Sequence, residues 1–287
     1  MLTKRIVMLF FRDRANVFFS LLAVLIILGL YILFLGDMME QALRSTIGFD
    51  SDKIGLTMSS VVLAGMIAVT GITSCMGAQE ISVGDKEAAA KDFLTSPAPR
   101  RKITTGYILG AAVIGLIMSI IALGICLVYI VLKGGSFPGI ADIGLLLLTL
   151  LLSVLCGNAM VYFMSVFIKS QNAFSAVSTV LGTLIGFLMG IYVPIGQMPE
   201  SIQWVIKCFP MSHSASMFRQ LLADGELTEL FAGTPPEALS GFREMFGIVL
   251  VFGGYTATFW FSAAVLVVTT IVFFLLSLLV MRVRKAG

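Results

Sequence analysis

The chain has 287 residues, of which 58% are apolar and only 12% are charged, and its formal net charge is +3. Soluble globular proteins carry about 25% charged residues. The composition therefore excludes a soluble domain, and four cysteines exclude a disulfide scaffold. We expect an all-α integral membrane protein with one transmembrane domain over residues 1–287.

Residues 1–16 predict an amphipathic helix lying in the inner membrane interface. Ile6, Leu9 and Phe10 fall on one helical face, and basic residues flank them on both sides. A helix of this kind is held by its buried apolar face and by attraction to anionic lipids. A merely basic flank to the first span is the alternative interpretation.

Six segments free of Asp, Glu, Lys, Arg and His are long enough to span a bilayer, which takes about 20 residues. They are residues 15–36, 54–79, 103–132, 143–168, 170–199 and 245–281. The last segment is too long for one span, and the pair Gly253 and Gly254 predicts a break that leaves 255–280. The fifth is expected to end near Gly190, because the prolines beyond it lack the amide proton of a helix interior.

Six spans place both termini on one side, and the basic residues identify that side as the cytoplasm. With the termini inside, the inner segments hold 13 of the 19 basic residues but 5 of the 16 acidic ones. This is the positive-inside pattern. We therefore expect a multi-pass protein of the cytoplasmic membrane, of bacterial origin.

The predicted spans contain no ionisable residue apart from cysteine and tyrosine. Proton- or sodium-coupled carriers usually need buried acids, histidines or lysines as relays or ligands. The chain also lacks the Gly-x-x-x-x-Gly-Lys-Ser/Thr loop that cradles nucleotide phosphates. We predict no catalytic, metal or cofactor-binding residue here, so energy for transport has to come from another chain.

Small residues recur at helix-contact spacing in two of the spans. Gly182, Gly186 and Gly190 form a double Gly-x-x-x-Gly pattern in the fifth, and Gly106 and Gly110 form another in the third. Such faces let two helix backbones approach closely. They predict either a helix pair that separates to open a path or static packing.

Asn158 is the polar residue singled out within the fourth span. Its amide needs a partner in the membrane, so it is expected either to line the substrate path or to bond a neighbouring helix.

The inner loop 80–102 predicts a short helix. Ser82 and Asp85 form a Ser-x-x-Asp capping pattern at its start, and Glu87 and Lys91 stand four residues apart in the favourable order. Pro97 marks its end. Such a helix could transmit a push from a bound partner; a solvated connector is the alternative.

The outer segment 191–254 is too apolar for a fully hydrated loop. Its residues predict short helices that rest in or dip into the outer leaflet, with Trp204 as an interface anchor. Backbone at that depth has to lie against protein or water, so the segment is expected to act as a gate or lid. An outer cap without a part in transport is the alternative.

Three groups of residues stand in a defined order along the chain. They are Lys4, Arg5, Arg12, Asp13 and Arg14; then Asp85, Lys86, Glu87, Phe93, Leu94, Thr95, Ser96, Pro97 and Arg100; then Gly190, Pro194, Met198, Pro199, Trp204, Phe209, Pro210 and Arg219. In this order they resemble the interfacial helix, the coupling loop and the outer re-entrant signature of the membrane subunit of type-2 ABC exporters. The resemblance covers essentially the whole length.

The resemblance implies two cytoplasmic ABC ATPase subunits, which use Mg-ATP, and a second permease subunit, identical or related, in the lipid bilayer. It implies no nucleic-acid partner. The coupling residues would be Asp85, Glu87, Lys91, Phe93, Leu94, Pro97 and Arg100. The helix-contact or path residues would be Gly182, Gly186, Gly190 and Asn158, and the outer gate would comprise Pro194, Pro199, Trp204, Pro210 and Arg219.

The aromatic composition favours an amphipathic or apolar cargo, such as a drug, an antibiotic peptide or a lipid-like molecule. Saccharide paths are usually lined by Tyr and Trp, whereas this chain has 22 Phe against 6 Tyr and 2 Trp. A saccharide exporter of the same family is the alternative. From other classes, a membrane-embedded lipid-modifying enzyme using Asp85, Glu87 and Asp92, or a scaffold or sensor, also remains open.

Overall fold

The structure is a computed structural model that describes residues 2–31, 33, 36–37, 40–41, 44, 53–88 and 100–286. Within these ranges the chain is predominantly helical. In chain order the long helices are α1 (Leu2–Arg12), α2 (Arg14–Leu30), α4 (Lys53–Ala88), α6 (Arg100–Leu132), α7 (Ile140–Phe167), α8 (Gln171–Leu188) and α13 (Phe259–Ala286). Between α8 and α13 lie the 3-10 helix η2 (Ile195–Gln197), the helices α9 (Glu200–Cys208), α10 (Pro210–Leu222), α11 (Asp224–Leu230) and α12 (Pro236–Met245), and the strands β1 (Val251–Phe252) and β2 (Tyr255–Thr256).

Five of the described helices are long and apolar enough to cross a membrane. Their spans are Lys53–Asp85, Lys102–Leu132, Ile140–Phe167, Gln171–Leu188 and Phe259–Met281. The first span predicted from the sequence falls on α2, whose described part has 17 residues. An all-α membrane protein is thus confirmed, while the sixth span stays a prediction.

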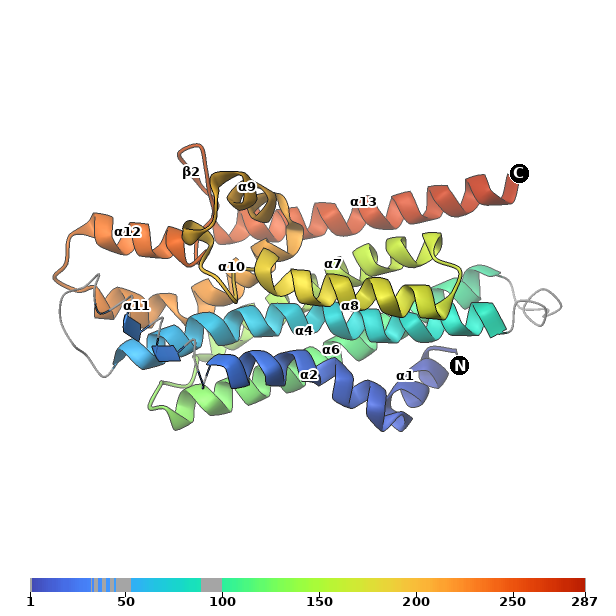
Figure 1. Cartoon of the computed structure of the whole chain (residues 1–287), viewed down its shortest axis with the longest axis horizontal. Coiled ribbons are helices and arrows are strands. Elements are labelled where there is room, and N and C mark those ends of the chain that lie inside the picture. Colours follow the sequence, from blue (N-terminus) through green and yellow to red (C-terminus); the bar gives the residue numbers. More distant parts are fainter. Residues whose placement is uncertain are drawn as a thin grey trace.

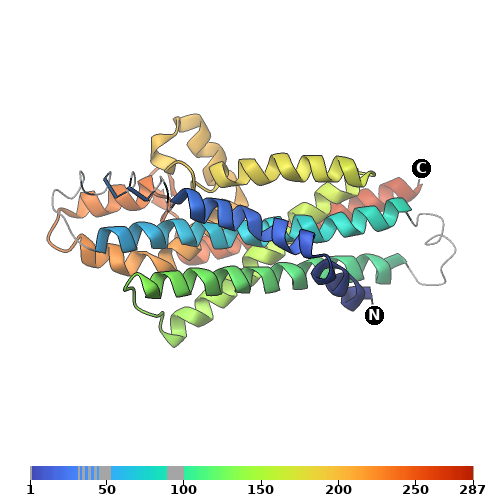
Figure 2. The ribbon, with the colours of Figure 1, turned by 60° about the horizontal axis from the view of Figure 1, so that its bottom comes forward.

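The long helices run side by side, and both chain ends lie at the same end of the bundle (Figure 1). Helix α4 passes through the middle, between α2, α6 and α8 (Figure 2). In the most apolar stretch of α4, 89% of the residues are buried inside the bundle, whereas in that of α13 only 11% are buried. The difference follows from composition, because α4 is rich in small residues that permit close helix packing and α13 carries bulky Phe, Leu and Val.

Helix α1 packs against α6 through the small-residue face of the third span. Ile6 and Phe10 are fully buried, and Gly106 and Gly110 lie against Leu2 and Ile6. The helix contact predicted for the two glycines is therefore confirmed. Leu9 is 38% exposed. Of the three residues predicted to form one apolar face, Ile6 and Phe10 therefore pack inside the protein, whereas Leu9 remains partly exposed. Its membrane-interface position stays a prediction.

The helix start predicted at Ser82 is wrong. Helix α4 continues without a break from Lys53 to Ala88, and the Ser82 side chain is buried within it. A capping serine satisfies backbone N–H groups that have no helical partner, and inside a continuous helix those groups are already bonded to carbonyls one turn earlier. The second span and the start of the predicted inner helix are therefore one rod.

The breaks predicted at glycine are confirmed. Gly253 and Gly254 have positive φ values of 54° and 95° and form the turn between β1 and β2, which pair antiparallel. Helix α13 begins only at Phe259, four residues beyond the predicted start. Helix α8 ends at Leu188, and Gly190, with φ 62°, reverses the chain after it.

Candidate functional site

The C-terminal end of α4, which the sequence places on the inner side, carries an acidic hub that joins three helices. The Asp85 carboxylate accepts a hydrogen bond of 2.7 Å from the Tyr107 hydroxyl on α6. It also forms a 2.9 Å ion pair with the Arg5 guanidinium on α1. Asp85 therefore connects α4 to both α1 and α6. Its hydrogen bond and ion pair with Arg5 raise the pKa of Arg5.

On its other side the same end of α4 binds the start of α8. The Gln171 backbone N–H donates a 2.7 Å hydrogen bond to Glu87, and the Ser175 hydroxyl donates to Glu80. Glu87 thus places a carboxylate on the N-terminus of a helix, where unpaired N–H groups and the helix dipole favour negative charge. Two carboxylates of α4, about two helical turns apart, hold α8 in this way.

Only part of this hub is predictable from the sequence. Asp85 and Glu87 were predicted, but Tyr107, Gln171 and Ser175 were not, because each lies 22 to 95 residues from its partner and carries no local signal. Four predicted coupling residues, Lys91, Phe93, Leu94 and Pro97, lie outside the described residues. Arg100 forms the start of α6, and only its backbone is described.

Asn158 is buried at the centre of the bundle, where it bonds two neighbouring helices. Its Nδ2 donates to the carbonyl of Ile108 on α6 at 3.0 Å, and its Oδ1 accepts from Gln79 Nε2 on α4 at 3.3 Å. Of the two roles predicted for Asn158, the structure places it in the interhelical bond. Its role in the substrate path stays a prediction.

The glycines predicted as a contact face on α8 have three different surroundings. A Cβ atom at Gly182 would meet nothing within 4 Å. At Gly186 it would lie 2.2 Å from the ring of Tyr192, and at Gly190 2.6 Å from Ile195. The last two glycines therefore make room for the chain that returns after α8. Gly182 is thus without a close neighbour among the described residues, and a contact with a second subunit stays a prediction.

The predicted outer-gate prolines each stand at a helix start. Pro194 precedes η2, Pro199 precedes α9, and Pro210 is the first residue of α10. Proline suits these places because its fixed φ fits the first turn and its missing N–H would have no helical partner. Trp204 on α9 is 46% exposed, with its ring 6.1 Å from that of Phe252. The structure contains short helices in 191–254, as predicted. Their position in the outer leaflet and their function as a gate stay predictions.

Arg219 is the most deeply embedded charge of the described outer segment. It is 1% exposed, and its guanidinium donates to the carbonyls of Met189 at 2.8 Å and Gly190 at 3.1 Å, just beyond the end of α8. Longer bonds reach Val61 in α4 at 3.3 Å and Gly247 at 3.4 Å. Burial lowers the pKa of Arg219 to about 10, which leaves it charged at neutral pH. One side chain thus joins α10 to α4 and to the end of α8.

His213, the single histidine, is locked in place on the same helix. Its Nε2 donates to the Lys207 carbonyl at 3.1 Å, so Nδ1 accepts from the Ser262 hydroxyl, also at 3.1 Å. Its ring stacks on Phe252. Burial lowers the pKa of His213, so the ring is neutral at physiological pH. His213 lies within the outer segment, and no local pattern in the sequence indicates that it joins α10 to α13.

No group of three or more His, Cys, Asp or Glu residues that could hold a metal ion occurs within the part of the chain that the structure describes. All four cysteines are free, with Cys208 exposed and the others buried. The described polar residues at the two ends of the bundle thus form hydrogen bonds and ion pairs that connect helices.

Comparison with known proteins identifies the family. Residues 51–279 match the sequence model of a family described as ABC-2 family transporter protein. No curated protein matches the chain. Because the family match covers well over half of the sequence, the chain belongs to the ABC-2 transporter family as a membrane component.

Proposed function

We propose that this chain is the transmembrane subunit of an ATP-powered exporter, working as a pair of permease subunits driven by two cytoplasmic ATPases that bind Mg-ATP. Family membership supports the transport role. The carrying observation is the acidic hub at the inner end of α4, where Asp85 and Glu87 hold three other helices.

The hub gives a route by which a push at the inner face reaches the spans. A partner that displaces the end of α4 also pulls on α1 and α6 through Asp85 and on α8 through Glu87. Because α4 is one continuous helix from Lys53 to Ala88, displacement at one end tilts the whole rod. The predicted coupling residues just beyond Ala88 are where the ATPase would bind.

The outer end of α8 is held by a second tie. Its first residue is bonded to Glu87, and the carbonyls that follow its last turn are bonded to Arg219. A tilt of α8 would therefore move α10, and with it the outer segment. In this mechanism Arg219 and the helices started by Pro194, Pro199 and Pro210 form the outer gate.

The described exposed face of α8 suits a path for an amphipathic cargo. It combines Val180, Leu184 and Phe187 with the hydroxyl residues Thr179 and Thr183. Each threonine hydroxyl already donates to a carbonyl of its own helix, so its hydrogen is not available to bond a cargo molecule. Such a surface favours a drug, an antibiotic peptide or a lipid-like molecule over a saccharide.

The proposal is tested by purifying the tagged chain with the ATPase encoded in an adjacent reading frame. We expect co-purification, and ATP-dependent uptake of an amphipathic dye into inverted vesicles. Glu87→Lys should keep assembly of the permease but uncouple ATP hydrolysis from uptake. The matched control Glu237→Lys, an exposed residue of outer helix α12, should leave coupling intact. Uptake by the chain without any ATPase would overturn the proposal.

A further inference from the structure

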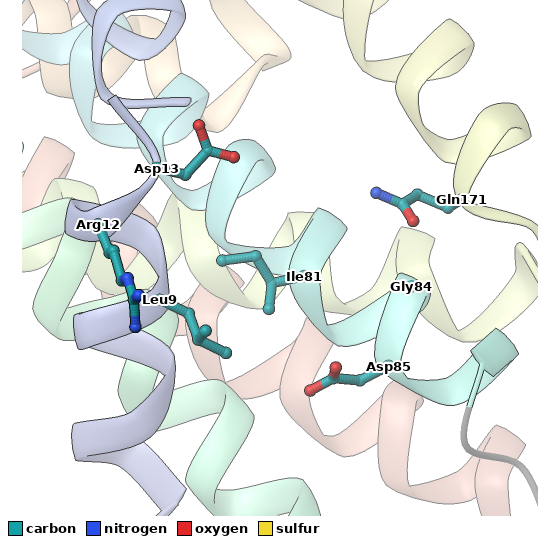
Figure 3. A pocket seen from close by; sticks show the side chains of 7 residues that line it. All are labelled: Leu9, Arg12, Asp13, Ile81, Gly84, Asp85 and Gln171. Carbon is teal, nitrogen blue, oxygen red and sulfur yellow. The ribbon is translucent and has the colours of Figure 1, made fainter. Parts of the chain in front are cut away.

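A pocket of about 520 Å³ lies where α1, α4 and α8 meet, beside the acidic hub (Figure 3). Leu9 and Arg12 come from α1, Ile81 and Asp85 from α4, and Gln171 from α8. This volume is within the range of small-ligand sites, about 300–1,000 Å³. The proposed ATP-driven transport does not require the pocket to be filled.

The pocket lies at the ends of two helices that are long and apolar enough to cross a membrane. Asp85 is the last residue of the span in α4, and Gln171 is the first residue of the span in α8. Arg12 ends α1, just before α2 begins. Residues at span ends stand at the level of the phospholipid head groups. The surrounding molecules that could enter are therefore lipids.

The polar lining offers both signs of charge across one space. Arg12 and Asp13 lie side by side in the chain at the end of α1, and Asp85, which also pairs with Arg5, lies on α4. The Arg12 guanidinium is exposed and makes no ion pair with another described residue. Across the pocket stands the Asp85 carboxylate, and Gln171 adds an amide that can donate and accept. Figure 3 shows the Gln171 amide reaching into the space from α8. This pairing fits a zwitterion, with its anion at Arg12 and its cation at Asp85.

The rest of the lining is apolar and shaped around the amide. Leu9 and Ile81 extend into the space from α1 and α4 (Figure 3). A Cβ atom at Gly84 would lie 2.5 Å from Gln171 Oε1, so the missing side chain lets the amide rest over α4. Two aliphatic side chains beside a polar rim suit the junction between a head group and its acyl chains.

We infer that this pocket binds the head group of a phosphoethanolamine lipid of the surrounding leaflet. Arg12 bonds the phosphate, and the primary ammonium donates to Asp85 and to the Gln171 amide oxygen. A quaternary choline has no N–H to donate, and a phosphoglycerol has no cation. The site therefore selects phosphatidylethanolamine over phosphatidylcholine and phosphatidylglycerol.

Native mass spectrometry of the purified, delipidated full chain tests this selection. The chain is titrated with the three lipids, all with identical acyl chains. We expect the dissociation constant for phosphatidylethanolamine to be about tenfold lower than for the other two, as one charge-assisted hydrogen bond provides. Arg12→Gln removes the contact to the phosphate that the three lipids share, so it should weaken the binding of all three. Gly84→Ala, which displaces the Gln171 amide that accepts from the ammonium, should reduce the preference for phosphatidylethanolamine.

Arg14→Gln is the matched control, because Arg14 carries the same charge nearby but does not line the pocket. It should keep both the affinity for the three lipids and the preference among them. Equal binding of the three lipids, or equal losses in the Arg12 and Arg14 variants, would overturn the inference. Full competition by soluble glycerophosphoethanolamine would overturn the lipid assignment in favour of a free zwitterion. Monodisperse elution of each variant confirms that it is folded.

Discussion

The Tyr107 hydroxyl donates a 2.7 Å hydrogen bond to the Asp85 carboxylate, across the boundary between α6 and α4. Tyr107 is 2% exposed, so its ring is packed among helices while its polar end reaches the hub. The bond places a membrane-span residue in direct contact with a residue predicted to couple to the ATPase.

Removal of this hydroxyl tests how firmly the hub is built. Tyr107→Phe keeps the ring and deletes one hydrogen bond to a charged group, so we expect a loss of about 1–2 kcal/mol in unfolding free energy. The fall in thermal midpoint of the detergent-solubilised protein measures it. Tyr255→Phe is the control, because that ring is 52% exposed. Equal midpoints for the two variants would contradict a structural role of the bond.

The guanidinium of Arg219 should be far more important for stability than an ordinary surface cation. Arg219→Met leaves the carbonyls of Met189 and Gly190 without their donor in a buried site, which we expect to cost roughly 3 kcal/mol. Arg243→Met breaks a partly exposed pair with Asp224, at a cost of about 1 kcal/mol. Thermal midpoints of both variants give the comparison. A smaller loss for Arg219→Met than for Arg243→Met would show that the buried tie is not needed.

Glu226 on α11 should make stability depend on pH. Burial raises the pKa of Glu226 above 4.5, and the hydrogen bond from Ser60 only partly opposes this. The folded state then holds the proton more tightly than the unfolded state, so stability falls as pH rises from 4.5 through the folded pKa. Glu226→Gln should remove this part of the fall, and Glu237→Gln should not. Melting curves between pH 4 and pH 8 would reveal the difference, and parallel curves for wild type and Glu226→Gln would refute it.

Trp204 in the outer segment and Trp260 at the start of α13, the two tryptophans of the chain, report where this end of the bundle lies. They are 46% and 65% exposed, and tryptophan prefers the membrane interface. In vesicles, lipids brominated near the head group should quench their fluorescence more than lipids brominated at the chain ends. Trp204→Phe and Trp260→Phe separate the two signals. Strong quenching by an aqueous quencher such as iodide, with none by bromolipids, would place the segment in water instead.

Features that depend on local composition were predictable. Apolar runs without charge predicted the five described helices that are long and apolar enough to span a membrane, because a helix in lipid has to satisfy its own backbone and present apolar side chains. The glycine pair 253–254 predicted a turn, and Gly106 and Gly110 predicted a close helix contact. The helix start predicted at Ser82 was wrong, because a Ser-x-x-Asp pattern can also occur inside a continuous helix such as α4.

The amino-acid sequence by itself determined that this is a helical membrane protein with charged residues confined to its ends. Only the tertiary structure decided what those charges hold together. Asp85 meets Arg5 from 80 residues away, and Arg219 bonds the carbonyl of Val61 across 158 residues. A backbone carbonyl has no signature in sequence, because every residue has one. Only the folded arrangement of the helices determines which carbonyls surround the buried guanidinium and which helices the acidic hub contacts.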